Sequence, residues 1–273
     1  MADEYSDKVV WITGAGSGIG RALALEFAAQ GAVVASSGRR IEPLEETTEQ
    51  VESAGGSGLV VPCDVTKVTE LQGAVEEIIE QTGRLDVVVA NAGFSVAGSF
   101  ESLSAADWSR QFDTNVIGLA MTVKYALPHL RKTEGRIALM GSVAGTLGLP
   151  NNGPYSASKF AVRSIGQTLT AELAGSGVSC TSLLPGFIES EIGQVDNHGQ
   201  YREEWEDRRP EKLMWPADRA ARSMLRAITK RRSEAVITGH GKVVAFAANH
   251  APRLTQQVVG RFGQNARDRN TDE

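Results

Sequence analysis

Short apolar runs alternate with longer helical stretches along most of this 273-residue chain. The runs are continuous in valine, isoleucine, leucine and alanine, which is typical of strands buried on both faces. The predicted strands lie at 8–13, 32–37, 58–65, 85–93, 136–142, 178–186 and 234–238, and the predicted helices at 18–30, 41–54, 68–83, 104–131, 154–174 and 216–230. This alternation predicts an α/β fold in which helices cover both faces of a parallel sheet.

No linker and no short-period repeat interrupts the pattern, so we predict a single domain over residues 1–273. A net charge of −5 gives no reason to expect nucleic acid as a partner. No apolar run is long enough to span a bilayer and the N-terminus lacks an apolar signal region, so a cytoplasmic protein is expected.

Cys63 and Cys180 stand in apolar runs and are expected to be buried thiols, with a bridge between them left open. The cysteines and histidines show no metal-ligand spacing, so no metal is expected.

Residues 187–215 break the alternation with a polar, highly charged stretch. They follow the sixth predicted strand, and the carboxyl ends of strands in such sheets open onto binding sites. Long loops at that edge are often lids, so we predict a substrate lid here. A solvated surface insertion is the alternative.

The C-terminal segment 242–262 carries apolar side chains at helical spacing, interrupted by Pro252. These side chains are Val243, Val244, Phe246, Leu254, Val258 and Phe262. The segment could pack on the protein's own core, on a partner subunit or on a membrane surface, and the first two are favoured. It opens a C-terminal extension over 242–273, whose last part, 263–273, is polar and expected to be disordered.

A glycine-rich turn, TGAGSGIG at 13–20, lies between the first predicted strand and the first predicted helix. Its spacing is G-x-x-x-G-x-G and not the G-x-G-x-x-G of most dinucleotide folds. Gly14 permits a sharp turn, while Gly18 and Gly20 let the backbone approach a pyrophosphate and pack the helix against the strand. The helix N–H groups and the Ser17 hydroxyl can hold the anion. The turn predicts a phosphate-bearing cofactor, with a ligand-free glycine turn as the alternative.

The second predicted strand ends in SSGRR, at 36–40. Proteins that bind NAD usually have an acidic residue here that accepts a hydrogen bond from the ribose 2′-hydroxyl, but Gly38 occupies that place. Arg39 and Arg40 follow, and a guanidinium can bind a 2′-phosphate through two parallel hydrogen bonds. NADP(H) is therefore favoured over NAD(H), unless both arginines only begin a solvated helix.

The third and fourth predicted strands also end in candidate cofactor contacts. Asp64 can meet an adenine amino group, with the backbone of Val65 beside it, although Asp64 could equally cap the following helix. Ala92 and Gly93 let backbone pass close to a ligand, while Asn91 can tie neighbouring turns together.

The stretch GPYSASKF places Tyr155 four residues before Lys159, on one face of a predicted helix. A free phenol has a pKa of about 10, and a cation beside it favours the phenolate and lowers that pKa. Ser142 ends the fifth predicted strand, at the same sheet edge as the glycine turn. Asn115 stands within the long fourth helix, where a leucine would favour the helix more.

With these motifs in one order and at these spacings, the chain resembles the classical short-chain dehydrogenase/reductase family over roughly residues 8–240. The resemblance is carried by Thr13–Gly20, Asp64, Asn91–Ala92–Gly93, Asn115, Ser142, Tyr155–Lys159 and Pro185–Gly186. It implies a single Rossmann-type domain, a three-layer sandwich with a seven-stranded parallel sheet. It also implies hydride transfer between nicotinamide C4 and a carbonyl or carbinol carbon.

The resemblance also assigns roles to residues. By it Tyr155 is the general acid/base, Ser142 orients the substrate oxygen, and Asn115 holds a proton-relay water through a helix irregularity. Lys159 binds the nicotinamide ribose and lowers the pKa of the tyrosine. The implied cofactor-binding set is Gly14, Ser17, Gly18, Ile19, Gly20, Ser37, Arg39, Arg40, Asp64, Val65, Asn91, Ala92, Gly93, Tyr155, Lys159, Pro185, Gly186, Ile188 and Ser190.

Two positions depart from the family pattern. Ser190 stands where many members have a threonine that touches the nicotinamide carboxamide. The paired glycine that commonly follows the last strand is absent, which puts the usual tetramer in doubt. A homodimer or homotetramer is the resulting expectation.

These features predict an NADP(H)-dependent oxidoreductase acting on a secondary alcohol/ketone pair, as a carbonyl reductase. Phe94 and the loop 143–153 are apolar to small, which favours a hydrophobic small-molecule substrate. An NADP(H)-binding regulator or scaffold without turnover is the first alternative. A membrane-associated, lipid-modifying member is the second, because of the apolar C-terminal segment.

Overall fold

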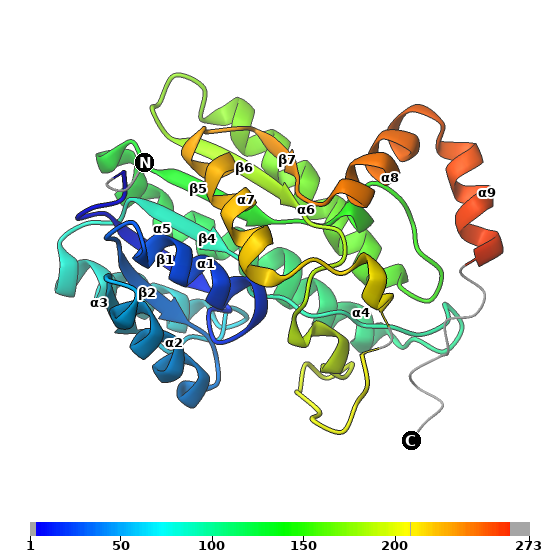
Figure 1. The fold of residues 1–273 in the computed structure, drawn as a ribbon, viewed down its shortest axis with the longest axis horizontal. Coiled ribbons are helices and arrows are strands. Elements are labelled where there is room, and N and C mark those ends of the chain that lie inside the picture. The colour runs from blue at the N-terminus through cyan, green and yellow to red at the C-terminus, as the bar shows by residue number, and fades with distance from the viewer. Residues whose placement is uncertain (1–3, 208, 263–273) are drawn as a thin grey trace.

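Seven parallel strands form one sheet in the order β3-β2-β1-β4-β5-β6-β7 in the structure, a computed structural model that describes residues 4–207 and 209–262 (Figure 1). The strands are β1 (Val9–Thr13), β2 (Val33–Ser37), β3 (Ser57–Val60), β4 (Val87–Ala90), β5 (Arg136–Met140), β6 (Ser179–Leu184) and β7 (Glu234–Val236). The strand order reverses at β1, which lies between β2 and β4. A crevice opens at such a reversal outside the carboxyl ends of the strands, where ligands bind in α/β sheets. The predicted disorder of 263–273 lies outside the described residues.

Helices cover both faces of the sheet, as predicted. They are α1 (Gly18–Ala28), α2 (Ile41–Ser53), α3 (Val68–Thr82), α4 (Ala105–Phe112), α5 (Leu119–Thr133), α6 (Gly153–Glu172), α7 (Ala217–Thr229), α8 (Gly239–His250) and α9 (Pro252–Phe262). One core contains side chains of α1, α2 and α7, and a second core contains side chains of α3, α5 and α6. In β1, Val10 and Ile12 enter the first core while Val9 and Trp11 enter the second. The continuous apolar runs therefore bury both faces of each strand.

Two predicted elements differ from the observed ones. The third strand ends at Val60 rather than at Val65, and Pro62 follows, which has no N–H to donate to a ladder. The long helix predicted at 104–131 is divided by a π-helical turn over Asp113–Gly118. Such turns occur frequently at functional sites.

The C-terminal segment forms two helices that meet at Pro252, the first residue of α9, where the missing N–H costs nothing. Their inner sides pack against a third, small core. Its buried members are Val143, Leu147 and Ala248, with Leu149, Val236, Val244 and Val259 packed against them. Among the described residues no helix is both long enough and apolar enough to cross a bilayer.

Candidate active site

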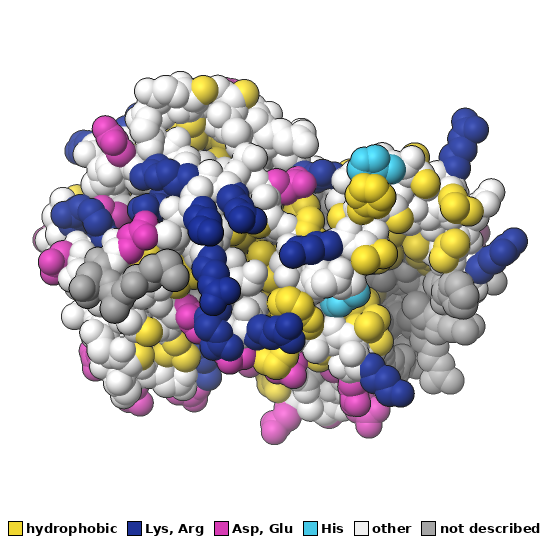
Figure 2. All heavy atoms as spheres, turned by 45° about the horizontal axis from the view of Figure 1, so that its top comes forward, with side chains coloured by type: hydrophobic (Ala, Val, Ile, Leu, Met, Phe, Trp, Pro, Cys, Tyr) yellow, Lys and Arg dark blue, Asp and Glu magenta, His cyan; other side chains and the backbone are white. Residues whose placement is uncertain are grey.

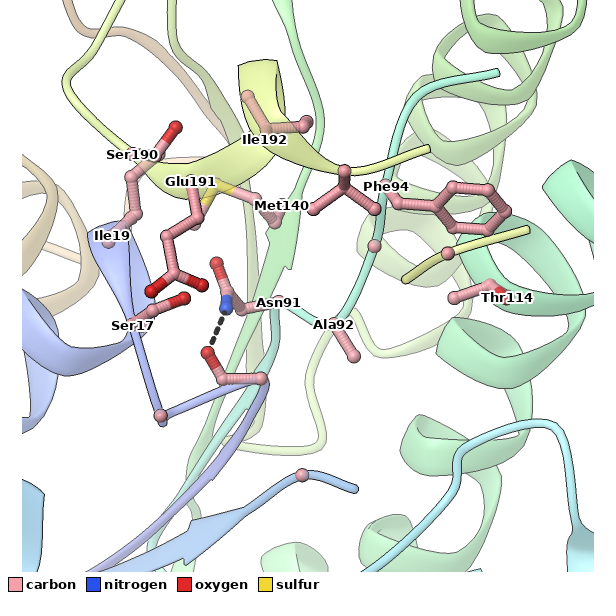
Figure 3. A pocket seen from close by; sticks show the side chains of 18 of the residues that line it. Ser17, Ile19, Asn91, Ala92, Phe94, Thr114, Met140, Ser190, Glu191 and Ile192 are labelled. Atoms are coloured by element: carbon pink, nitrogen blue, oxygen red, sulfur yellow. Dashed lines mark hydrogen bonds between the residues drawn. The ribbon is translucent and has the colours of Figure 1, made fainter. Parts of the chain in front are cut away.

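A cavity of about 680 Å³ opens at the carboxyl edge of the sheet, around the reversal at β1 (Figure 3). Almost every predicted site residue lines it: Gly14, Ser17, Gly18, Ile19, Gly20, Arg39, Arg40, Asp64, Val65, Asn91, Ala92, Gly93, Ser142, Tyr155, Lys159, Pro185, Gly186, Ile188 and Ser190. Asn115 and Ser37 do not line it. Gly14 and Ser190, 176 positions apart in the chain, are thus brought around one space by the topology of the sheet.

The glycine turn has the backbone that the sequence predicts. Gly14 adopts φ +68°, and a Cβ at Gly20 would lie 2.1 Å from the Gly14 carbonyl oxygen. The Asn91 Nδ2 donates to the carbonyl oxygens of Thr13 (2.9 Å) and Gly14 (3.1 Å), so it ties the β4 and β1 turns together as expected (Figure 3). Ser17 precedes α1, and its hydroxyl makes no capping bond to the helix. The start of α1 therefore presents N–H groups and a hydroxyl to the cavity.

One predicted cofactor contact, Ser37, and one predicted helix cap, Asp64, need correction, although Asp64 still lines the cavity. Ser37 is fully buried, and its Oγ accepts a hydrogen bond from Trp11 Nε1 (2.8 Å) below the cavity. Asp64 does not cap a helix, because α3 begins at Val68 after Lys67. The Asp64 carboxylate instead accepts from the backbone N–H (3.0 Å) and hydroxyl (2.8 Å) of Thr66, closing a local turn.

Both candidate phosphate-binding arginines contact the segment 187–215. The Arg39 guanidinium donates to the Gly199 carbonyl oxygen at 2.6 Å. Arg40 forms an ion pair with Glu191 at 2.5 Å and lies 5.4 Å from the centre of the Tyr201 ring. The arginines are therefore not a merely solvated helix start, because the segment after β6 folds back over them.

Tyr155 and Lys159 lie one turn apart on α6, facing the cavity beside Ser142. The Ser142 side chain is hydrogen-bonded to Tyr155, and its Oγ also accepts from Ala144 N (3.1 Å) at the turn after β5. Lys159 is 5% exposed, and its Nζ donates to the Met140 carbonyl oxygen at 2.8 Å. The same Nζ lies 5.6 Å from the centre of the Tyr155 ring.

The electrostatics of this group differ from the expectation in one respect. Burial raises the pKa of Tyr155, while the Ser142 hydrogen bond and the positive charge of Arg209 act to lower it. Burial lowers the pKa of Lys159 to about 8. The positive charge of Arg209 and the hydrogen bond from Ser142 thus act against burial at Tyr155, while the Lys159 ammonium donates to Met140 beside the ring. The net shift is upward because removing a phenolate from water is the larger effect.

Asn115 lies in the π-helical turn and is almost fully buried. Its Oδ1 accepts from the backbone N–H of Phe94 and its Nδ2 donates to the Phe94 carbonyl oxygen, each at 3.1 Å. The Nδ2 also reaches Ser158 Oγ at 3.2 Å, on α6. Asn115 therefore joins the β4 loop to α6 beneath the cavity, and the helix irregularity implied by the family resemblance is present.

The segment 187–215 supplies cavity residues that sequence reasoning did not single out, among them Glu191, Ile192, Tyr201 and Arg209. Arg209 donates to the carbonyl oxygens of Ile188 (2.9 Å) and Ser190 (2.8 Å). The Glu191 backbone N–H lies beside the start of α1, 3.9 Å from the place that a Cβ at Gly18 would take. Only the position of this segment after β6 pointed to such contacts, because irregular chain has no periodicity to show which side chains turn inward.

The sheet order and the place of the cavity define a Rossmann-type α/β protein with its binding site at the strand reversal. The sequence pattern of the family described as short chain dehydrogenase matches residues 8–200. The chain belongs to the short chain dehydrogenase family, whose members are oxidoreductases that bind a nicotinamide cofactor.

Three similar proteins illustrate the relationship. The chain is 40% identical over 194 residues to 11-beta-hydroxysteroid dehydrogenase A of Arachis hypogaea, covering 70% of this chain and 55% of that protein. It therefore spans about half the length of that relative. It is 31% identical over 188 residues to hydroxynaphthalene reductase arp2 of Aspergillus fumigatus, covering 68% of each. A short chain dehydrogenase/reductase from Burkholderia phymatum, solved in complex with NAD, has a TM-score of 0.82 and 29% identity, covering 93% of this chain and 96% of that one.

Proposed function

We propose that this protein is an NADP(H)-dependent reductase of a hydrophobic ketone, with Tyr155 as its general acid/base. One observation carries the proposal: Ser142, Tyr155 and Lys159 line the same cavity as the glycine turn and the two arginines. A nicotinamide dinucleotide held by the turn would supply hydride within reach of that group. Asn115 and Lys159 are proposed to support catalysis by Ser142 and Tyr155. Asn115 does so by fixing the β4 loop against α6.

Tyr155 is proposed to donate a proton to the carbonyl oxygen while Ser142 donates a second hydrogen bond to it. Burial raises the pKa of Tyr155, so its hydroxyl is protonated at neutral pH and is ready to donate. In the reduction, the ketone carbon gains hydride, its oxygen gains the tyrosine proton, and solvent returns a proton to Tyr155. The raised pKa thus keeps Tyr155 in the protonated form that the reduction of a ketone uses.

The choice of NADP(H) rests on the end of β2. Gly38 offers no carboxylate to a ribose 2′-hydroxyl, and Arg39 and Arg40 line the cavity beside it. A guanidinium forms charge-assisted hydrogen bonds to phosphate. The NAD in the Burkholderia phymatum structure is bound by that protein, and the arginines favour the phosphorylated cofactor in this one.

The proposed substrate is a fused-ring or similarly hydrophobic ketone. Phe94, Met140, Ile192 and Val195 contribute apolar side chains to the cavity wall. Two relatives carry names that refer to hydroxysteroid and hydroxynaphthalene substrates. Both kinds of molecule are flat and largely apolar, which suits a wall of this composition.

Consumption of NADPH with a panel of steroid, quinone, ketoacyl and sugar-type carbonyls tests the proposal. We expect turnover of at least one fused-ring ketone and a loss of about 100-fold or more in kcat for Tyr155→Phe. NADPH binding, followed by fluorescence, should survive in that variant. Tight NADPH binding with no turnover of any carbonyl would instead favour the alternative, a regulator or scaffold of the same fold.

A homo-oligomer in the cytoplasm is part of the proposal. Ile117 in the π-helical turn and Phe160 on α6 are 51% and 44% exposed, and these two elements are in contact. Apolar side chains of this size on adjoining helices suit a subunit interface. Light scattering of Phe160→Glu should then report a smaller particle than the wild type.

A further inference from the structure

The outer face of the C-terminal helix pair carries large apolar side chains that stay exposed in the described part of the chain, although the His250 ring stacks on Phe246. Exposed fractions are 70% for Val243, 65% for Phe246, 63% for Leu254 and 48% for Val258. Side chains three or four positions apart share one face of a helix, so α8 and α9 each present one apolar face outward. Figure 2 shows hydrophobic side chains gathered over this end of the molecule. We call these four residues the outer face.

The outer face takes no part in the three cores of the described residues. The opposite sides of the same helices already pack inward, through Val244 of α8 and Val259 of α9, against the small core beneath them. Exposed apolar side chains on both helices of a pair, with the inner sides already buried, mark an interaction site rather than part of the core.

The charge around the outer face restricts what can bind there. Residues 239–262 contain Lys242, Arg253 and Arg261 and no aspartate or glutamate, in a chain whose net charge is −5. All three basic side chains are exposed, and Figure 2 shows basic side chains projecting from the edges of this region. The helix pair thus combines an apolar centre with a positive rim.

A second copy of the chain fits this surface poorly. In a twofold interface the same patch meets itself, so the basic rim would face an identical basic rim without a carboxylate on either helix pair. A lipid surface that carries anionic headgroups offers both partners at once, negative charge for the rim and acyl chains for the apolar centre. We propose that the outer face docks the protein peripherally on an anionic lipid surface.

Docking there would bring the substrate side of the cavity toward the lipid. Leu147 and Leu149, on the loop after Ser142, belong to the core beneath the helix pair, and Gln256 Nε2 donates to the Gly148 carbonyl oxygen at 3.3 Å. His240, near the start of α8, accepts from the Phe187 N–H (3.1 Å) directly after Pro185–Gly186. A ketone dissolved in the membrane would then have access to the site. This consequence rests on the proposed function, whereas the docking itself is independent of it.

Co-sedimentation of the full chain with vesicles tests the docking. We expect binding to phosphatidylcholine vesicles that contain phosphatidylglycerol, at least tenfold weaker binding to phosphatidylcholine alone, and weakening by salt. Replacing Lys242, Arg253 or Arg261 by glutamine should lower the affinity about fivefold each. Val258→Glu and Phe246→Glu should abolish binding, whereas Val68→Glu, at a valine 43% exposed on α3, should not. Thermal unfolding of each variant checks that it is folded.

Two outcomes would overturn the docking. One is a failure of the wild type to sediment with anionic vesicles at low salt, and the other is equal binding by Val68→Glu and Val258→Glu. If the wild type does not sediment with vesicles and Val258→Glu halves the particle mass in light scattering, the outer face joins copies of this chain instead. Binding by Tyr155→Phe at wild-type affinity would separate docking from catalysis, because an inactive enzyme can still dock.

Discussion

Asn115 and Phe94 are joined by two reciprocal hydrogen bonds, side-chain amide to backbone amide, each 3.1 Å long. The amide of Asn115 thereby pairs with both backbone polar groups of a residue that lies beyond the end of β4, and Gln111 Nε2 also donates to the Phe94 carbonyl oxygen at 2.8 Å. Gly93 makes the approach possible, because a Cβ there would lie 2.9 Å from Asn115 Oδ1. The π-helical turn and the β4 loop are therefore fixed relative to each other, with the Phe94 side chain on the cavity wall (Figure 3).

Asn115→Ala should destabilise the protein and slow its reaction. It leaves the N–H of Phe94 unpaired, whereas the Phe94 carbonyl oxygen keeps the hydrogen bond from Gln111 Nε2 (2.8 Å). An unpaired buried group costs about 1–3 kcal/mol, and we expect a loss of that size. Urea denaturation measures the loss, and kcat should fall more than the affinity for NADPH. Asn249→Ala, on the exposed side of α8, is the matched control and should change stability by less than about 0.5 kcal/mol. A loss below about 1 kcal/mol for Asn115→Ala would contradict this role.

The buried ammonium of Lys159 should make stability depend on pH. Its folded pKa is about 8 and its ordinary value 10.5, so the unfolded chain binds the proton more tightly. The charge is present in both states below pH 8, where burying it costs up to about 3 kcal/mol, and absent from both above pH 10.5. Lys159→Met should therefore be more stable than cofactor-free wild type at pH 7. That advantage should shrink as pH rises from 8 to 10.5, and a difference that stays constant would contradict it.

Arg39→Ala should raise the KM for NADPH by about one to two orders of magnitude, or roughly 1.5–3 kcal/mol for a charge-assisted contact. The KM for NADH should change little, because NADH has no 2′-phosphate for the guanidinium to bind. Steady-state kinetics with both cofactors make the comparison within one variant. Arg39 also donates to the Gly199 carbonyl oxygen, so equal increases for NADPH and NADH would point to displacement of residues 187–215 instead.

The sheet and most of the cavity wall were predictable because their signals are local. A run such as Val9–Thr13 shows its double-sided burial in its composition, and a turn such as that at Gly14 shows its backbone in its glycines. Parallel strands then place their carboxyl ends at one edge, which brings Ser142 near the glycine turn without further information.

The remaining contacts depend on pairs that are far apart in the chain. Arg40 meets Glu191 and Arg39 meets Gly199, 151 and 160 residues later, through a segment whose irregular backbone has no periodicity. Ser37 was misplaced for a different reason. It ends β2 on the face that Trp11 occupies, and a strand's sequence does not specify which face its last side chain takes.

Gly20→Ala should weaken both folding and NADPH binding. The new Cβ would lie 2.1 Å from the Gly14 carbonyl oxygen and 2.8 Å from Asn91 Nδ2. Backbone cannot yield there without moving the turn, so we expect a loss of about 1–3 kcal/mol in urea denaturation and a higher Kd for NADPH. Gly73→Ala is the control, because Gly73 lies inside α3 with nothing within 4 Å of its added Cβ, and it should stabilise the protein by about 0.5–1 kcal/mol. Equal effects of the two substitutions would mean that the close approach of α1 to the turn has no energetic role.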